Sequence, residues 1–382
     1  MMNFIFFFLI NLVCYSGFSQ KSKTPEPVKF IDKIVIPCSS VKNQFHSGTC
    51  WSFATVSFIE AELLRIKQVD YDLSEMFFVN YAYKQKAVDY VSYQGKTNFS
   101  EGGQAHDVMN IIKEYGVVPE TVYNGLNYGE THHNHDEFSG MLTNMLSGLI
   151  GEAGSKLTTA WKPSVNSVID IYLGEIPENF TYKDKNYTPY SFAKELNINP
   201  DDYYEFSSYT NEPFYEWFIL KIPDNWSRGE YMNLPIDELV SLIDNALLNG
   251  FSVCWDGDVS ENGFSHKHEM AVIPEKPVQF LSPAEKDEYF STLKDEAIIT
   301  QEMRQSAFEN LTTTDDHLMH IIGISYDQKG KKYYKTKNSW GTTSNSIGGY
   351  LYMSESYIKL KTTAIMIHKD AIIPEMKNKI KL

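Results

Sequence analysis

The spacing of apolar residues predicts helices in the first half of the chain and strands in its last third. Between 50 and 66, apolar residues recur at intervals of three and four, which is the helical period. Further helices are predicted at 74–87, 103–115, 137–150 and 235–249. Strand-like runs lie at 251–255, 269–273, 317–326, 332–337 and 349–353. Because helices and strands are segregated rather than alternating, the pattern indicates an α+β fold.

The first twenty residues predict a secretory signal peptide. Residues 4–13 are apolar, and small and polar residues follow them. This run is short for a membrane span, and the small residues near Ser19 and Gln20 suit signal cleavage. We therefore expect 1–20 to be a signal peptide and 21–382 to be exported, either to the periplasm or as a secreted protein. No stable membrane insertion is expected after signal removal. An uncleaved anchor is the alternative for this segment.

Composition and charge restrict the classes of partner. A hydrophobic content of 42% with 14% aromatic residues supports an extensive core rather than a disordered chain. The net charge is −15 and no segment has a basic face, so we expect no nucleic-acid partner. Without the signal, three cysteines remain: Cys38, Cys50 and Cys254. An odd number in an exported protein indicates at least one free thiol, and a Cys38–Cys254 disulfide stays open.

Cys50 lies where a polar turn gives way to the first predicted helix. Thr49 is the expected N-cap, which puts Cys50 in the first helical turn. The partial positive charge of a helix N-terminus favours the nucleophilic thiolate over the thiol. Gln44 precedes the helix, and its side-chain amide could bind an oxyanion together with the Cys50 backbone N–H. A buried structural cysteine is the alternative, and a nearby base would decide against it.

A base and a group to orient it are predicted near the C-terminal end. His317 begins an apolar strand and His320 follows three residues later, so their rings should point to opposite faces. A cysteine nucleophile needs one adjacent histidine and a third group that fixes the imidazole ring. Asn338, in "KNSWG", can accept a hydrogen bond from the imidazole. Trp340 would shield that hydrogen bond from water.

Together these pieces resemble the papain-like cysteine peptidases. The matching segments are "SGTCW", "DLSEMFF", "EGGQAHDVMNIIKEYGVVPE", "DHLMHIIG" and "KNSWG". The resemblance implies a helical left subdomain and a β-barrel-like right subdomain, with the active-site cleft between them. It implies catalytic roles for Cys50 as nucleophile, His317 as general base and acid, Asn338 as orienting group and Gln44 in the oxyanion hole. It implies substrate binding by Gly102 and Gly103, which would pair with the substrate backbone, and by Trp340. No metal and no organic cofactor is implied.

Within that family the chain is similar to the bleomycin hydrolase and aminopeptidase C branch. This similarity is carried by "MNLPIDELVSLIDNALLNGFSVCWDGDVS" and "MSESYIKLKTTAIMIHKDAIIPEMKNK". His317 lies about 270 residues after Cys50, whereas papain-type enzymes place this histidine about 130–150 residues after the cysteine. A large insertion is therefore expected, at roughly 120–250. In this branch the C-terminus enters the cleft and limits cleavage to chain ends, but "PEMKNKIKL" departs from the ending typical of the branch.

The expected function is therefore an exported cysteine peptidase that acts on peptides, with aminopeptidase activity favoured. An endopeptidase with an open cleft is the first alternative, because the tail is short. Acyl transfer to an added amine and an inactive binding protein on a peptidase fold are the others. The resemblance also allows for a homo-oligomer. We expect the histidines of "THHNHDE" to lie in a solvated loop rather than in a metal site.

Overall fold

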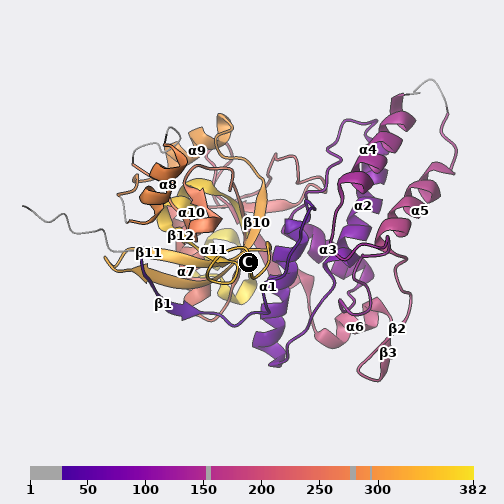
Figure 1. The fold of residues 1–382 in the computed structure, drawn as a ribbon, viewed down its shortest axis with the longest axis horizontal. Coiled ribbons are helices and arrows are strands. Elements are labelled where there is room, and N and C mark those ends of the chain that lie inside the picture. Colours follow the sequence, from indigo (N-terminus) through magenta and orange to yellow (C-terminus); the bar gives the residue numbers. More distant parts are fainter. Residues whose placement is uncertain (1–27, 152–155, 276–280, 293–294) are drawn as a thin grey trace, which may run out of the picture.

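A helical half and a half built around the large sheet lie side by side in Figure 1, and the sheet half carries helices of its own. The computed structural model describes residues 28–151, 156–275, 281–292 and 295–382. The predicted signal peptide lies outside these ranges. The α+β class is confirmed, because the helical half comes mainly from the first half of the chain and most long strands come from the last third. Over the ranges described, no helix combines the length and apolar character needed to span a bilayer.

The centre of the molecule is α1 (Cys50–Lys67), which is buried at every residue from Cys50 to Leu63. Apolar residues on most sides of α1 let it pack against both halves. Thr49 occupies the N-cap position but makes no side-chain capping hydrogen bond. Its hydroxyl instead lies 2.6 Å from the Ser47 hydroxyl. The start of the helix is thus as predicted, whereas the predicted cap is replaced by a contact within the preceding turn.

The helical half packs α2 (Glu75–Ser92) and α3 (Ala105–Tyr115) against α1. Ser74 caps α2 by accepting from the Phe77 N–H, and Gln104 and Asp107 cap α3 reciprocally. Further elements cover this core: α4 (Asp136–Gly151), α5 (Trp161–Leu173), β2 (Phe180–Tyr182), β3 (Lys185–Tyr187) and α6 (Pro189–Leu196). Large aromatic side chains such as Phe58, Phe77 and Phe138 are fully buried in it.

The other half contains an eleven-stranded sheet, counted over the residues described, in the order β5-β6-β4-β13-β7-β10-β11-β12-β9-β8, with β1 paired to β10. Its N-terminal and middle strands are β1 (Phe30–Val35), β4 (Tyr203–Ser207), β5 (Trp217–Ile219), β6 (Glu230–Asn233), β7 (Val253–Gly257), β8 (Phe264–Ser265) and β9 (Met270–Ala271). Its C-terminal strands are β10 (His317–Asp327), β11 (Lys332–Lys337), β12 (Tyr350–Ser354) and β13 (Thr362–His368). Four helices accompany the sheet, α7 (Ile236–Leu248), α8 (Pro283–Phe290), α9 (Gln301–Glu309) and α10 (Glu355–Lys361), and α11 (Pro374–Ile380) follows its last strand.

Side chains on the two faces of β10 pack into different hydrophobic cores. Leu318 packs in the core of the helical half, whereas Met319 and Ile321 pack in the core of the sheet half. This alternation puts His320 on the face of Leu318 and His317 on the face of Met319. The two histidines therefore lie on opposite faces, as the strand period predicts.

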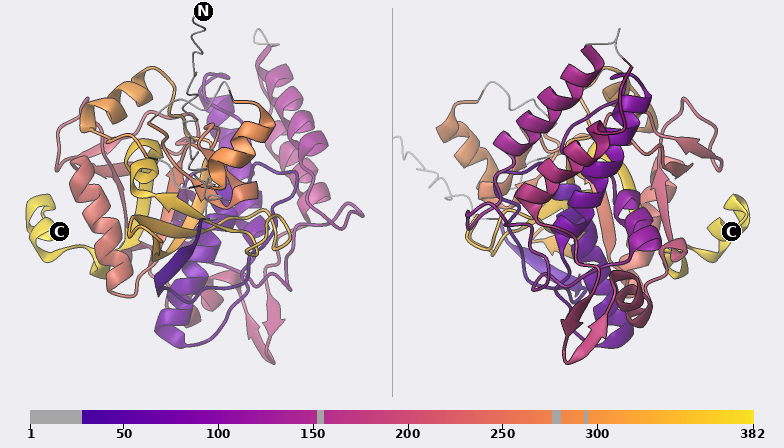
Figure 2. Two further views of the ribbon diagram at one scale, coloured as in Figure 1. Left: turned by 60° about the vertical axis from the view of Figure 1, so that its left-hand side comes forward. Right: turned by 90° about the vertical axis from the view of Figure 1, so that its right-hand side faces the viewer.

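Residues 120–250, where an insertion is predicted, contribute to both halves. They supply α4, α5 and α6 to the helical core and β4, β5, β6 and α7 to the sheet half. The strand β4 pairs with β13, which ties this segment to the end of the chain. Helix α11 packs its Met376 and Ile380 into the sheet core. Figure 2 places the C-terminus at the outer edge of the sheet half.

Candidate active site

A pocket of about 450 Å³ lies where the start of α1 meets the start of β10. Four of the predicted site residues line it: Gln44, Cys50, Gly102 and His317. Three acidic residues line it as well: Glu101, Asp224 and Asp316. Residues far apart in the sequence thus meet in one pocket at the boundary between the two halves.

Cys50 lies in the first turn of α1 and is 8% exposed. The backbone of Leu318, the second residue of β10, acts on the pKa of the thiol, which places the sulfur beside the start of that strand. Burial raises the pKa of the Cys50 thiol to about 12. The Leu318 N–H lowers this pKa, whereas the Asp224 carboxylate raises it.

His317 is held by the residue predicted to orient it. Its Nε2 lies 2.8 Å from the Asn338 Oδ1. The same Oδ1 accepts the Ser339 backbone N–H at 2.8 Å, so Asn338 presents its oxygen and His317 donates from Nε2. The lone pair of the neutral imidazole is then on Nδ1, the nitrogen left for a substrate or for Cys50. The Trp340 ring centroid lies 5.1 Å from that of His317, at 35°, beside this hydrogen bond.

The charge state of this pair differs from the expected thiolate. Burial lowers the pKa of His317 to about 4, against the opposing effect of the Asn338 hydrogen bond. With the Cys50 pKa raised, the structure favours a neutral thiol beside a neutral imidazole at neutral pH. The physical reason is that burial penalises both charged forms and that nearby carboxylates oppose a second negative charge.

The Gln44 amide is fixed on both sides. Its Nε2 donates to the Ser47 carbonyl at 2.7 Å, and its Oε1 accepts from the Ser339 hydroxyl at 2.6 Å. An amide nitrogen carries two hydrogens, so one remains for a group in the pocket. The side chain is thereby oriented with a donor available near Cys50.

The two predicted substrate-binding glycines lie in different surroundings. Gly102 lines the pocket, and its carbonyl accepts a hydrogen bond from the Lys86 ammonium. A Cβ at Gly102 would lie only 1.8 Å from the Asp224 Oδ2, so the carboxylate rests directly on this glycine. Gly103 is buried under the Trp51 indole, which a Cβ would approach to 2.9 Å, and it does not line the pocket.

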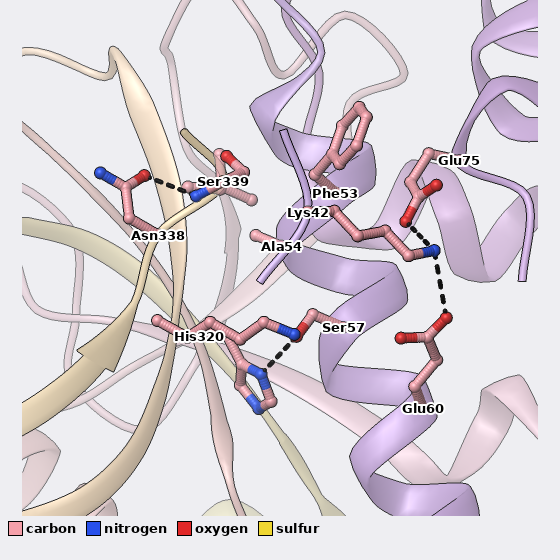
Figure 3. A pocket seen from close by; sticks show the side chains of 11 residues that line it. Lys42, Phe53, Ala54, Ser57, Glu60, Glu75, His320, Asn338 and Ser339 are labelled. Atoms are coloured by element: carbon pink, nitrogen blue, oxygen red, sulfur yellow. Dashed lines mark hydrogen bonds and ion pairs between the residues drawn. The ribbon is translucent and has the colours of Figure 1, made fainter. Parts of the chain in front are cut away.

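His320 lies deeper, between α1 and β10. Figure 3 shows its ring pointing toward Ser57 of α1, and its Nδ1 lies 2.8 Å from the Ser57 hydroxyl. In the same region Lys42 binds Glu75 at 2.7 Å and Glu60 at 3.4 Å. His320 is completely buried and does not line the pocket of Cys50.

The prediction that the histidines at 132, 133 and 135 lie in a solvated loop is wrong for two of them, because His133 and His135 are buried, with ring centroids 6.0 Å apart. His132 packs edge-on against Phe45, with ring centroids 4.2 Å apart. His133 is buried, and burial lowers its pKa to about 4. Over the ranges described, no three histidine, cysteine or acidic side chains are grouped so that they could hold a metal ion. Cys38 and Cys254 are both free thiols and are not bonded to each other.

The sequence reasoning did not identify the three acidic residues of the pocket. Glu101 and Asp316 directly precede Gly102 and His317, so their positions next to predicted site residues were a usable signal. Asp224 lies in the segment 222–229, far from every predicted site residue in sequence. Its place over Gly102 follows from the path of the chain, which periodicity and motifs do not show.

Comparisons with known proteins identify the family and the fold. The Peptidase C1-like family matches residues 15–381. The chain is 25% identical to aminopeptidase G of Lactobacillus delbrueckii subsp. lactis, over 87% of this chain and 82% of that protein. It is also 25% identical to the bleomycin hydrolase of Rattus norvegicus, over 93% of this chain and 86% of the relative. A crystal structure of PepW from Lactobacillus rhamnosis HN001 superposes with a TM-score of 0.72 at 19% identity, covering 92% and 84% of the two chains, which confirms the fold.

Proposed function

Since this chain belongs to the Peptidase C1-like family, we propose that Cys50, His317, Asn338 and Gln44 form the catalytic site of a cysteine peptidase. The observation that carries the proposal is the pocket in which Cys50 and His317 meet, with Asn338 fixing the imidazole from behind. A thiol and a neutral base that line one pocket, with a third group that orients the base, are what nucleophilic catalysis needs.

The neutral resting pair sets the order of proton transfers. As the Cys50 sulfur bonds to the substrate carbonyl carbon, its proton moves to His317 Nδ1. The oxygen that becomes negative is stabilised by the Gln44 amide and the Cys50 backbone N–H. His317 then gives the proton to the leaving amine, the C–N bond breaks and a thioester remains. Water attacks the thioester with His317 as base, which releases the carboxylic acid and restores the thiol.

Within this activity we favour an aminopeptidase. The similar proteins named aminopeptidase G and bleomycin hydrolase cover most of the chain, which supports this proposal. An endopeptidase is the second candidate. It is favoured by the observation that no residue of the C-terminal helix α11 lines the pocket, so the cleft has no cover from that end of the described chain.

Substitution of the nucleophile tests the proposal. We expect Cys50→Ala to abolish hydrolysis of a fluorogenic aminoacyl amide while the melting temperature stays close to that of the wild type. Cys38→Ser is the matched control, because Cys38 is also a free thiol but does not line the pocket. The control should retain full activity. Turnover that persists in purified Cys50→Ala would refute the catalytic role of this thiol.

We also propose that the protein is exported after removal of residues 1–20. The support is the apolar run at 4–13 followed by small and polar residues. Mass measurement of the mature N-terminus from the native source tests this. A chain that begins near residue 21 outside the cytoplasm is expected, and an intact N-terminus in the cytoplasm would contradict it.

A further inference from the structure

The pocket of Cys50 is negatively charged. Glu101, Asp224 and Asp316 line it, and among its described lining residues there is no lysine or arginine. Two of these carboxylates are held by backbone groups, because Glu101 Oε2 accepts from the Gly48 N–H at 2.5 Å and Asp316 Oδ1 accepts from the Val259 N–H at 2.9 Å. Such a pocket favours a cationic group on the ligand.

Asp224 is the carboxylate of these three that lies over Gly102, and one of its oxygens accepts no hydrogen bond from a described residue. Its Oδ1 accepts from Asn98 Nδ2 at 3.0 Å and from the Ser100 hydroxyl at 3.2 Å. No hydrogen bond from a described residue reaches Oδ2, the oxygen that rests on Gly102. The nearby Lys86 donates instead to the carbonyls of Ser100 and Gly102. Asp224 Oδ2, at the wall of the pocket, can therefore accept a hydrogen bond from a ligand.

The turn that carries Asp224 is held firmly in place. Asn225 bonds the carbonyls of Leu220 and Gly229 at 2.9 and 3.0 Å, which closes the turn on itself. Asn98 donates to the Pro223 carbonyl at 3.2 Å, which ties the turn to the loop before Gly102.

Ser227 fixes the same turn to α3. Its hydroxyl donates to Asp107 at 2.6 Å and lies 2.9 Å from the His106 Nε2. His106 in turn contacts Glu205 of β4 at 2.6 Å. Contacts on several sides thus position the Asp224 carboxylate, as expected for a group that acts by its location.

We propose that Asp224 binds the α-ammonium group of the substrate's N-terminal residue and so restricts the site to peptides with a free N-terminus. The inference rests on the proposed peptidase function and assigns its specificity to one residue. An α-ammonium would donate to Oδ2 and be paired with the carboxylate. An N-acylated chain that continued along Gly102 would meet the carboxylate there and bring no charge to it. Among the carboxylates that raise the pKa of the Cys50 thiol, Asp224 has the largest effect.

The test compares alanine coumarylamide with its N-acetyl form in the wild type and in Asp224→Asn. Asparagine keeps an acceptor for Asn98 and Ser100, so the turn should be preserved. We expect the wild type to prefer the free amine and the variant to lose about 10- to 100-fold of that preference, chiefly in kcat/KM for the free substrate. Asp184→Asn, in the exposed turn between β2 and β3, is the control and should leave the preference unchanged. An unchanged preference in Asp224→Asn would overturn the proposal.

The ammonium group that Asp224 binds could instead come from a lysine side chain of the substrate. Nα-acetyl-lysine coumarylamide tests this alternative, because its α-amine is blocked and its side-chain ammonium is free. If this blocked substrate is preferred and Asp224→Asn removes its cleavage selectively, the assignment to the α-ammonium is wrong. We expect instead that Nα-acetyl-lysine coumarylamide is cleaved as poorly as acetylalanine coumarylamide. Asp224→Asn should not change its rate of cleavage.

A binding measurement separates this inference from the proposed function. In Cys50→Ala protein, alaninamide should bind more tightly than N-acetylalaninamide in calorimetry, and Asp224→Asn should remove the difference. If the wild type hydrolysed neither substrate, the peptidase function would fail, yet this binding difference would still support the role of Asp224. Equal binding of both amides by Cys50→Ala protein would overturn that role even if hydrolysis were normal.

Discussion

At the scale of single residues, the nucleophile and the base of the candidate site both favour their uncharged forms, although carboxylates line the same pocket. Burial acts on Cys50 and His317 in opposite directions, raising the thiol pKa to about 12 and lowering the imidazole pKa to about 4. We therefore expect the Cys50 thiolate and the His317 imidazolium to form during the reaction rather than in the resting protein. The environment of the pair consists of Asp224, Asp256 and Asp315 around the sulfur and Asn338 and His266 around the imidazole.

This account predicts that the His317 ring stays neutral from neutral pH down to about pH 5. A histidine pKa that is lowered by burial means that the proton is taken up only at lower pH, near 4. Histidine ring signals in NMR spectra recorded across pH 4–8 measure this, with the His317 signal assigned by its absence in His317→Ala. A midpoint near 6.5 would show an ordinary solvated histidine, and one above 7 would show a thiolate–imidazolium pair.

At the scale of elements, strands β7 and β10 bring two acidic residues together behind the pocket. Asp256 lies on β7 opposite Leu318, and Asp315 lies two residues before β10 begins and accepts from Gln104 Nε2 at 3.0 Å. Asp256 is 3% exposed and its carboxylate oxygens have no partner among the described side chains. Burial raises the pKa of Asp315 to about 7, and burial together with Asp315 raises the pKa of Asp256 well above its ordinary value.

We predict that Asp315→Asn stabilises the protein at alkaline pH. A carboxyl whose pKa is raised on folding costs stability as the pH rises from about 4, where the unfolded group ionises, through about 7. The variant should gain about 2–4 kcal/mol in unfolding free energy at pH 8, and the gain should shrink toward pH 5. Denaturant titrations at both pH values measure this, with Asp184→Asn as the exposed control. A gain that is equal at both pH values would exclude titration of Asp315 as its cause.

Sequence periodicity predicts the long helices and strands but not the shortest strands. The long helices α1, α2, α3, α4 and α7 and the strands β10 and β11 begin and end within a few residues of the predicted positions, because each has a sustained period. Strands of two or three residues, such as β2, β5 and β8, are too short to show a period. The strand β13 was missed because it follows α10 directly, without a turn that would mark its start.

The same limit applies to the site. Cys50, His317, Asn338 and Gln44 were found because each lies within a recognisable local segment, and three of them line one pocket, with Asn338 behind it. Asp224 could not be found in this way. Its contact with Gly102 depends on the path of the chain through both halves. No motif or periodicity in residues 222–229 predicts that contact.

At the scale of the molecule, function depends on the boundary between the halves. The helical half supplies Cys50 and Gly102, the sheet half supplies His317 and Asn338, and residues 120–250 supply Asp224. The C-terminal helix packs on the sheet half, and none of its residues lines the pocket. Residues 120–250 thus form one side of the pocket.

The most direct measurement of the central claim is covalent labelling with an alanine chloromethyl ketone, followed by intact mass and peptide mapping. The account predicts one added group per chain, on Cys50, and a loss of hydrolytic activity in proportion to labelling. Cys38 and Cys254 should remain unmodified, since neither lines the pocket. Full hydrolytic activity in protein labelled completely at Cys50 would contradict the account.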